Sequence, residues 1–212
     1  MSLHTRARAR LLAATAIAAG AALAPAPAGA DTYEKVQVSS RAHVLYGKSV
    51  RVKGYIRPRD SGRKVLIMVR KPGSDWQIVA RPKTGREGRF RAQWRPKSVT
   101  RYKVRAFLTG SDARPRSVST TVYRTAHASW YGPGLYGNRT ACGQTLTSST
   151  QGVAHKSLPC GTRVSLYYRG RSTTVPVIDR GPYVDGRDYD LTAATANRLG
   201  FSGTDTIWAA PH

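Results

Sequence analysis

Ala128-Ser129-Trp130-Tyr131-Gly132 and Asp179-Arg180-Gly181-Pro182-Tyr183 bracket the part of the chain that holds nearly all of its candidate chemistry. From residue 126 onward glycine, threonine and tyrosine become more frequent and the positive charge falls. The glycines permit turns with positive φ and close approach of the backbone, and the Trp and Tyr rings offer faces on which sugars stack. We therefore expect the function to lie in this half of the chain.

Further short motifs lie between and after these two. They are Arg139-Thr140-Ala141-Cys142-Gly143-Gln144, Val153-Ala154-His155, Leu158-Pro159-Cys160-Gly161-Thr162 and Asp190-Leu191-Thr192. The alternation in Arg163–Tyr168 predicts a strand. The Ala-rich run Ala193–Leu199 predicts a short helix, which Thr192 can cap and Gly200 can end.

In this order, the motifs resemble those of the rare lipoprotein A family of septal-ring lytic transglycosylases. The resemblance runs from about His127 to Ala209. It implies a six-stranded double-psi β-barrel, a fold also seen in expansins and barwin-like proteins. It also implies action on peptidoglycan glycan strands, which the family cleaves without water to leave a 1,6-anhydro sugar.

The resemblance implies catalytic roles for two residues of this chain, and at a third family position the usual residue is replaced. Asp179 and His155 match family positions implicated in catalysis. Where family members usually carry Glu, this chain has Gln144. An amide donates and accepts hydrogen bonds but does not exchange a proton, so an acid or base role at this position is lost. We expect Gln144 to bind substrate or shape its loop instead.

The chemistry of the family needs one carboxyl of tuned pKa, because the group that protonates the glycosidic oxygen can later accept the proton of the sugar 6-hydroxyl. Asp179 can serve both steps. Arg180 is expected to stabilise developing charge or hold the carboxylate, and the rings of Trp130, Tyr131 and Tyr183 are expected to line a glycan groove.

Structural roles compete with these assignments. Asp179 could cap a turn or pair with Arg180 or Arg187, and His155 could be a barrel histidine bonded to the backbone. Three further acids fit turns and the start of the helix, namely Asp185, Asp188 and Asp190.

The two cysteines of the chain lie eighteen residues apart, and in an exported protein we expect them to form the disulfide Cys142–Cys160. No closely spaced His or Cys pair and no oxygen-rich calcium loop occurs, so we expect no metal site and no cofactor. No nucleophile elbow occurs either, which argues against a serine or cysteine hydrolase.

The preceding half predicts an immunoglobulin-like β-sandwich, since short alternating runs are separated by Gly, Pro, Asp and Ser clusters. In Ser49–Ile56, for example, Val50 and Val52 share one face while Arg51 and Lys53 share the other. The expected strands are Lys35–Val38, Ser49–Ile56, Lys64–Val69, Trp76–Ala80, Arg89–Trp94, Tyr102–Leu108 and Val118–Tyr123.

The charge is concentrated in this preceding half. The chain has 35 Lys and Arg against 11 Asp and Glu, a net charge of +24, and residues 31–125 hold 24 basic and 6 acidic side chains. The basic face either keeps the protein soluble and its sheet edges unpaired, or binds anionic wall polymers in a salt-dependent way. Few aromatics accompany the charge, so nucleic acid is not an expected partner.

The first thirty residues predict a secretion signal. Three arginines at positions 6, 8 and 10 precede an apolar stretch from Leu11 to Leu23, and Ala28-Gly29-Ala30 has the A-x-A form of a cleavage site. An uncleaved N-terminal anchor is the alternative. The apolar run is shorter than the roughly 20 residues of a transmembrane helix, which excludes a protein with several spans.

These observations predict three segments: a signal peptide over 1–30, a basic β-sandwich over 31–125 and a double-psi barrel over 126–212. The expected protein is secreted, associated with the cell wall, and cleaves peptidoglycan glycan as a lytic transglycosylase. A non-catalytic, expansin-like glycan binder is the main alternative, because of Gln144. A barwin-like protein-interaction or inhibitor module is the third.

Overall fold

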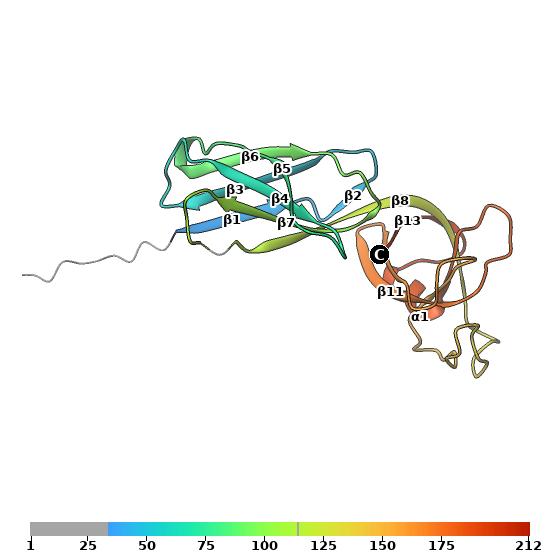
Figure 1. Ribbon diagram of the computed structural model, residues 1–212. Coiled ribbons are helices and arrows are strands. Elements are labelled where there is room, and N and C mark those ends of the chain that lie inside the picture. Colours follow the sequence, from blue (N-terminus) through green and yellow to red (C-terminus); the bar gives the residue numbers. More distant parts are fainter. Residues whose placement is uncertain (1–33, 114) are drawn as a thin grey trace, which may run out of the picture. The chain divides into compact units, whose positions relative to one another are not determined.

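The computed structural model describes residues 34–113 and 115–212, and the regular secondary structure of this part of the chain is almost entirely β (Figure 1). The predicted signal peptide lies outside the described residues. No helix in the described part is both long and apolar enough to span a bilayer.

The N-terminal half is the expected sandwich of two sheets. The first sheet is antiparallel in the order β1-β3-β6 and comprises β1 (Lys35–Ser40), β3 (Val50–Arg57) and β6 (Arg89–Trp94). A 3-10 turn, η1 (Arg86–Gly88), leads into β6. The second sheet holds β2 (His43–Leu45), β4 (Val65–Arg70), β5 (Gln77–Ala80), β7 (Thr100–Leu108) and the first part of β8 (Ser117–Tyr131).

The inward faces of these two sheets form one hydrophobic core. It includes Val52 and Ile56 of the first sheet and Ile67 and Val104 of the second, all at most 1 % exposed. All seven predicted strands are confirmed. Strand β2 was not predicted, because its three residues are too few to show an alternation.

The C-terminal half is a closed barrel of six strands. The strand order is β8-β13-β10-β11-β9-β12, and β12 pairs back to β8 to complete the ring. Parallel and antiparallel pairs both occur. Besides β8, the strands are β9 (Val153–Ala154), β10 (Arg163–Tyr168), β11 (Arg171–Asp179), β12 (Tyr189–Thr192) and β13 (Asp205–Pro211).

The predicted helix is α1 (Ala193–Leu199), and its ends follow the sequence signals. The Thr192 hydroxyl accepts the N–H of Thr195 at 3.3 Å, and Gly200 ends the helix with a φ of 65°. The hydroxyls of Thr192 and Thr195 also accept the N–H of Gly152. A Cβ at Gly152 would lie 2.5 Å from Ile178, so only glycine fits here and brings β9 against the helix start.

Strand β8 contributes to the second sheet of the sandwich and also to the barrel. Its residues up to Tyr123 pair with β2 and β7, and those from Arg124 pair with β13 and β12. The predicted boundary between residues 125 and 126 therefore falls inside one continuous strand and stays a prediction.

Candidate functional site

The candidate residues lie in register with one another on four neighbouring strands of the barrel. Ala154 of β9 is in register with Asp179 of β11 on one side and with Asp190 of β12 on the other, and Asp190 is in register with Ser129 of β8. Strands lie about 4.8 Å apart, so the Cα atoms of the two aspartates are separated by about 10 Å across β9. His155 directly follows Ala154. The sequence motifs around Asp179 and His155 thus meet in space.

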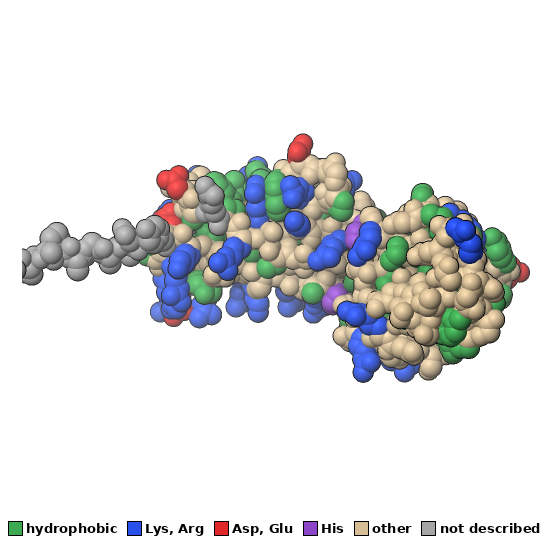
Figure 2. Space-filling model, turned by 90° about the horizontal axis from the view of Figure 1, so that it is seen from below, with side chains coloured by type: hydrophobic (Ala, Val, Ile, Leu, Met, Phe, Trp, Pro, Cys, Tyr) green, Lys and Arg blue, Asp and Glu red, His purple; other side chains and the backbone are tan. Residues whose placement is uncertain are grey.

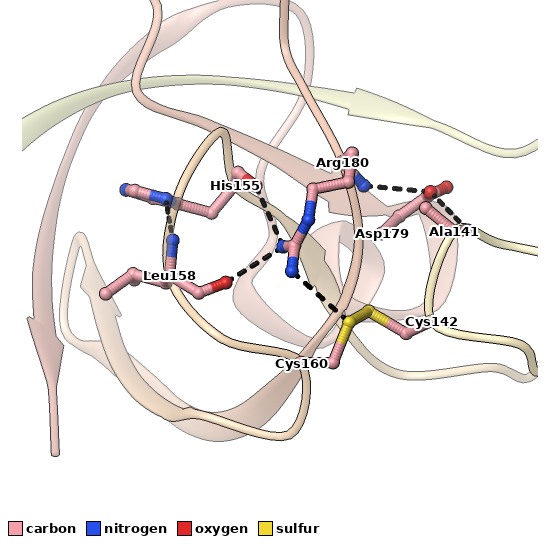
Figure 3. Close-up of a disulfide and its surroundings, with 7 residues drawn as sticks. All are labelled: Ala141, Cys142, His155, Leu158, Cys160, Asp179 and Arg180. Carbon is pink, nitrogen blue, oxygen red and sulfur yellow. Dashed lines mark hydrogen bonds between the residues drawn. A yellow bond between two sulfur atoms is a disulfide. The ribbon is translucent and has the colours of Figure 1, made fainter.

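The Asp179 carboxyl is held by two backbone donors. Its Oδ1 accepts the N–H of Ala141 at 2.8 Å and the N–H of Arg180 at 2.9 Å (Figure 3). The β9–β11 ladder shifts register between Val177 and Asp179, which places one extra residue on β11 next to the carboxyl. Among the described residues, Oδ2 has no hydrogen-bond partner, so one oxygen of the carboxyl is fixed and the other is unpaired.

The loop that carries Gln144 is anchored to this carboxyl. Besides the Ala141 bond, the N–H of Cys142 donates to the Ile178 carbonyl at 3.2 Å, and the disulfide joins Cys142 to Cys160. The N–H of Thr140 donates to the carbonyl of Gln144 at 2.9 Å, while the Gln144 side chain is exposed. The expected disulfide is confirmed, and the loop presents Gln144 to solvent close to Asp179.

His155 is bonded to the backbone through one ring nitrogen. Its Nδ1 accepts the N–H of Ser157 at 3.1 Å and of Leu158 at 3.0 Å, so the neutral ring carries its proton on Nε2. Burial lowers the pKa of His155, which favours the same neutral form. In Figure 3 the imidazole and the Asp179 carboxyl extend in opposite directions. The two residues meet through their backbones, where the N–H of His155 donates to the Asp179 carbonyl at 3.2 Å.

Arg180 clamps the loop between His155 and Cys160. Its guanidinium donates to the carbonyls of His155 and Leu158, at 3.3 and 2.8 Å, and lies 3.4 Å from Cys160 Sγ (Figure 3). Only its backbone N–H bonds to Asp179. The alternative of a side-chain ion pair between Asp179 and Arg180 is therefore not what the structure shows, and the guanidinium acts on the loop.

Asp190 is the residue whose place the sequence interpretation missed. It was assigned to a turn or helix start, but it lies within β12, half-buried, and its Oδ1 accepts the Ser129 hydroxyl at 2.6 Å. Burial raises the pKa of Asp190. Its distance from Asp179 in the sequence hid the relation, and only the pairing of both residues with Ala154 reveals it.

The Tyr131 phenol belongs to the same cluster. Its Oη is buried and has no hydrogen-bond partner among the described residues, and the same is true of Thr140 Oγ1 beside Ala141. Burial, then the negative charge of Asp179 and a side-chain interaction with its carboxyl, and then the charge of Asp190 raise the pKa of Tyr131. The phenol therefore keeps its proton and has an unused donor next to the carboxylates.

The predicted aromatic lining is only partly assembled. Neighbouring residues of a strand point to opposite faces, so Trp130 and Tyr131 cannot line one face together. The Trp130 ring is 39 % exposed and that of Tyr183 is 80 % exposed. Tyr136, which the sequence interpretation passed over, is also exposed, and its Oη would lie 3.0 Å from a Cβ at Gly132. The glycine of the Trp-Tyr-Gly motif therefore makes room for Tyr136.

Two further acids from the sequence analysis are Asp185 and Asp188. Asp188 accepts the backbone N–H of His127 at 2.8 Å, and Asp185 is exposed. Within the described ranges, no group of three or more His, Cys, Asp or Glu side chains is arranged to hold a metal ion.

Comparison with known proteins connects this geometry to a family. A family model described as "Lytic transglycolase" matches residues 123–208. Residues 123–208 form an RlpA-like double-psi β-barrel. The match covers the six barrel strands up to Trp208 in β13, and every residue of the site described above.

Curated relatives of the RlpA-like domain are described as endolytic peptidoglycan transglycosylases. "Probable endolytic peptidoglycan transglycosylase RlpA" of Synechocystis sp. is 45 % identical over 75 residues, which are 34 % of this chain and 23 % of the relative. "Endolytic peptidoglycan transglycosylase RlpA" of Campylobacter jejuni is 35 % identical over 101 residues, 47 % of this chain and 37 % of the relative. The Aquifex aeolicus protein is 44 % identical over 80 residues, with coverages of 37 % and 35 %.

The chain spans well under half the length of these relatives. Among solved structures, "Streptomyces papain inhibitor (SPI)" aligns with 24 % identity and a TM-score of 0.34, covering 42 % of this chain and 92 % of that one.

Proposed function

We propose that the RlpA-like domain cleaves peptidoglycan glycan strands as a lytic transglycosylase, with Asp179 as the acid and base. The observation that carries the proposal is the fixed Asp179 carboxyl, with one oxygen bound by two N–H groups and the other available to a ligand. It lies in a motif of the matched domain, and the relatives are described as endolytic peptidoglycan transglycosylases.

The reaction divides into two proton transfers at this carboxyl. Protonated Oδ2 gives its proton to the glycosidic oxygen, and the bond from that oxygen to the anomeric carbon breaks. The 6-hydroxyl oxygen of the same sugar then bonds to the anomeric carbon and its proton returns to Oδ2. No water is consumed, and the enzyme ends in its starting state.

Three neighbours assist this chemistry in distinct ways. Asp190 lies across β9 and holds a proton to a higher pH than an ordinary Asp, because burial raises its pKa. The Tyr131 phenol keeps its proton beside Asp179 and can donate it in a hydrogen bond to that carboxyl. His155 and Arg180 position the loop from residue 155 to residue 160.

Gln144 supports a second candidate function, that of a glycan binder without cleavage. Its amide stands on the anchored loop where family members usually carry a proton-exchanging Glu, so this chain has one catalytic carboxyl fewer. In that case the surface around Asp179 and Gln144 would bind glycan without cleaving it and loosen the wall, as expansins do.

The proposed place of action is the cell wall of a bacterium. The disulfide Cys142–Cys160 is typical of proteins outside the cytoplasm, and the relatives act on peptidoglycan by their description. We propose peptidoglycan strands as the partner of the barrel and anionic wall polymers as the partner of the basic sandwich.

The deciding experiment incubates the mature protein with intact and with amidase-stripped peptidoglycan and identifies sugar ends by mass spectrometry. We expect anhydro ends, and a loss of at least about 100-fold in Asp179→Asn, which keeps the shape of the side chain but not its proton exchange. Reducing ends would mean hydrolysis.

Absence of any product with retained glycan binding would establish the second function. In that outcome Gln144→Glu is the informative variant, since it restores the usual family carboxylate. Appearance of anhydro ends only in Gln144→Glu would show that this chain is a binder by virtue of that single position.

A further inference from the structure

All charged residues on the outward face of the β1-β3-β6 sheet are basic. Strand β3 alternates buried Val50, Val52 and Ile56 with three exposed cations, and β1 and β6 add cations in register with them. We call this surface the basic face. Its cations are Lys35, Arg51, Lys53, Arg57, Arg89 and Arg91, all exposed.

The arrangement works against the stability of the sheet. Lys35 is directly opposite Arg57, and Lys53 is directly opposite Arg91. Like charges in such cross-strand positions repel, because their Cβ atoms lie only about 5 Å apart. Of the six cations, only Arg89 forms an ion pair among the described residues, with Glu87 at 2.9 Å. A face selected for solubility alone would interleave acids with these cations.

Protection of sheet edges does not account for the pattern either. In the order β1-β3-β6, the edge strands are β1 and β6, where lysines and arginines prevent pairing with other chains. Strand β3 is central and paired on both sides, yet it carries Arg51, Lys53 and Arg57. These three charges have no edge to protect.

A groove lies at one end of the basic face, over the end of β1, the start of β3 and the end of β6. It has a volume of about 900 Å³ and is lined by Ser39, Arg51, Lys53, Arg91 and Gln93, among others. It is open to solvent, and Arg51 and Lys53 lie two residues apart on β3, about 7 Å, with Arg57 following after Tyr55. A shallow track with repeated charge suits an extended polymer better than a small anion.

We propose that the basic face binds a linear phosphodiester polymer of the cell wall. This inference rests on the proposed role of the sandwich in wall binding and names the binding surface and the ligand. Four of the six cations are arginines, whose forked donors match phosphate oxygens, and a phosphodiester keeps its charge at every physiological pH. Figure 2 shows how Lys and Arg side chains dominate the charged groups visible on the sandwich.

The aromatic content of the basic face argues against nucleic acid. Its aromatic residue Tyr55 is half-buried, and the Arg57 guanidinium lies 5.7 Å from its ring centroid. Binding of single-stranded nucleic acid relies on open rings on which bases stack. A phosphodiester polymer without bases fits the face as it stands.

The test compares two triple variants of the mature chain. Arg51→Gln, Lys53→Gln and Arg91→Gln together remove three charges at the groove. The control, Lys71→Gln, Arg101→Gln and Lys103→Gln, removes three exposed charges elsewhere on the sandwich. Binding of poly(glycerol phosphate), poly-glutamate and single-stranded DNA is measured by titration at several salt concentrations.

For poly(glycerol phosphate), we expect the groove variant to lose at least about 10-fold in affinity and the salt slope to fall by about 2, as for three lost phosphate contacts. The control variant should lose less than about threefold. Equal losses in both variants would overturn the assignment to this face. Tighter binding of poly-glutamate or of DNA at equal charge would overturn the assignment to a phosphodiester polymer.

Two further measurements keep these outcomes interpretable. The melting temperature of the groove variant at low salt should equal or exceed that of the parent, since the like-charge pair Lys53–Arg91 is relieved. Asp179→Asn should bind the polymer as the parent does. A failure of glycan cleavage would thus leave the polymer result standing, and the reverse also holds.

Discussion

His155 illustrates how a motif residue can act through the backbone. Its Nδ1 receives two N–H groups, while the ring packs against Tyr189 with centroids 4.9 Å apart. Protonation of Nδ1 would break both bonds. Position 155 therefore needs a hydrogen-bond acceptor where Nδ1 lies. The Arg180 guanidinium stabilises the same loop by donating to the carbonyls of His155 and Leu158.

We predict different outcomes for two conservative replacements of His155. Asn places its oxygen close to Nδ1, whereas Gln places it close to Nε2. His155→Asn should keep glycan cleavage within about fivefold of the parent, and His155→Gln should lose at least about 10-fold, measured as initial rates on stripped peptidoglycan. Equal large losses would show that the Nε2 proton itself takes part in the reaction.

The stability of the parent should also depend on pH through His155. Because burial lowers its pKa in the folded protein, this contribution is present above the ordinary His value of about 6.5 and is lost as the pH falls below it. His155→Asn should flatten this part of the stability profile, measured by urea unfolding from pH 8 to pH 5. An unchanged profile would assign the loss to other groups.

Asp190 is expected to favour activity at the expense of stability. Its carboxyl is half-buried with a raised pKa, so the ionised form is disfavoured, and the contribution of Asp190 to stability is lost as the pH rises through its folded pKa. Asp190→Asn keeps an acceptor for Ser129. We predict that this variant is at least as stable as the parent at pH 7 and that the difference shrinks below about pH 4.

Cleavage by Asp190→Asn should nevertheless fall at least about 10-fold if the second carboxyl assists Asp179. Ser129→Ala is the control for the shared hydrogen bond, since it removes the donor and keeps the acid. Full activity in Asp190→Asn would show that Asp179 works alone.

At the scale of elements, the sequence predicts a strand well where buried and exposed residues alternate over several positions. It predicts a strand less well where the strand is short and its partners lie far away in the sequence. The strands of the sandwich and helix α1 follow from alternation, turn residues and the Thr192 cap. Strand β9 has two residues, and its role depends on β11 and β12, which follow it much later. No local pattern shows that Ala154 joins two aspartates.

The disulfide is the element that holds the Gln144 loop against β11. It closes a separation of 18 residues and supplements the bonds from Ala141 and Cys142 to β11. Replacing both cysteines with serine should lower the free energy of unfolding by about 3 kcal/mol, by the loop-closure estimate, measured by urea denaturation. Addition of reductant to the parent should reproduce the loss, and a smaller effect would mean that the backbone bonds suffice.

At the scale of the whole molecule, the two halves divide their charges and their proposed tasks. Residues 31–125 carry 24 of the 35 basic side chains, while all candidate catalytic residues lie from residue 129 onward. The barrel motifs could be interpreted directly from the sequence because they occur in a known order. The alternation in Ser49–Ile56 also predicts a basic face of the sandwich, but the repulsion between opposite residues on it becomes visible only when the register of β1, β3 and β6 is known.

Linkage of a polymer-binding face to a cleaving barrel predicts a particular kinetic effect. Attachment to one wall polymer raises the effective concentration of the barrel near glycan, so it lowers the apparent KM without changing the chemical step. On walls that keep their phosphodiester polymers, the groove variant should show an apparent KM raised at least about fivefold and an unchanged maximal rate. On walls stripped of these polymers by hydrofluoric acid, parent and variant should behave alike.

Added salt should raise the KM of the parent only on unstripped walls, because screening weakens the contacts of the basic face and not the barrel chemistry. A variant that lost maximal rate on both kinds of wall would instead show that the basic face acts on the folding or catalysis of the barrel, and would refute attachment as its task.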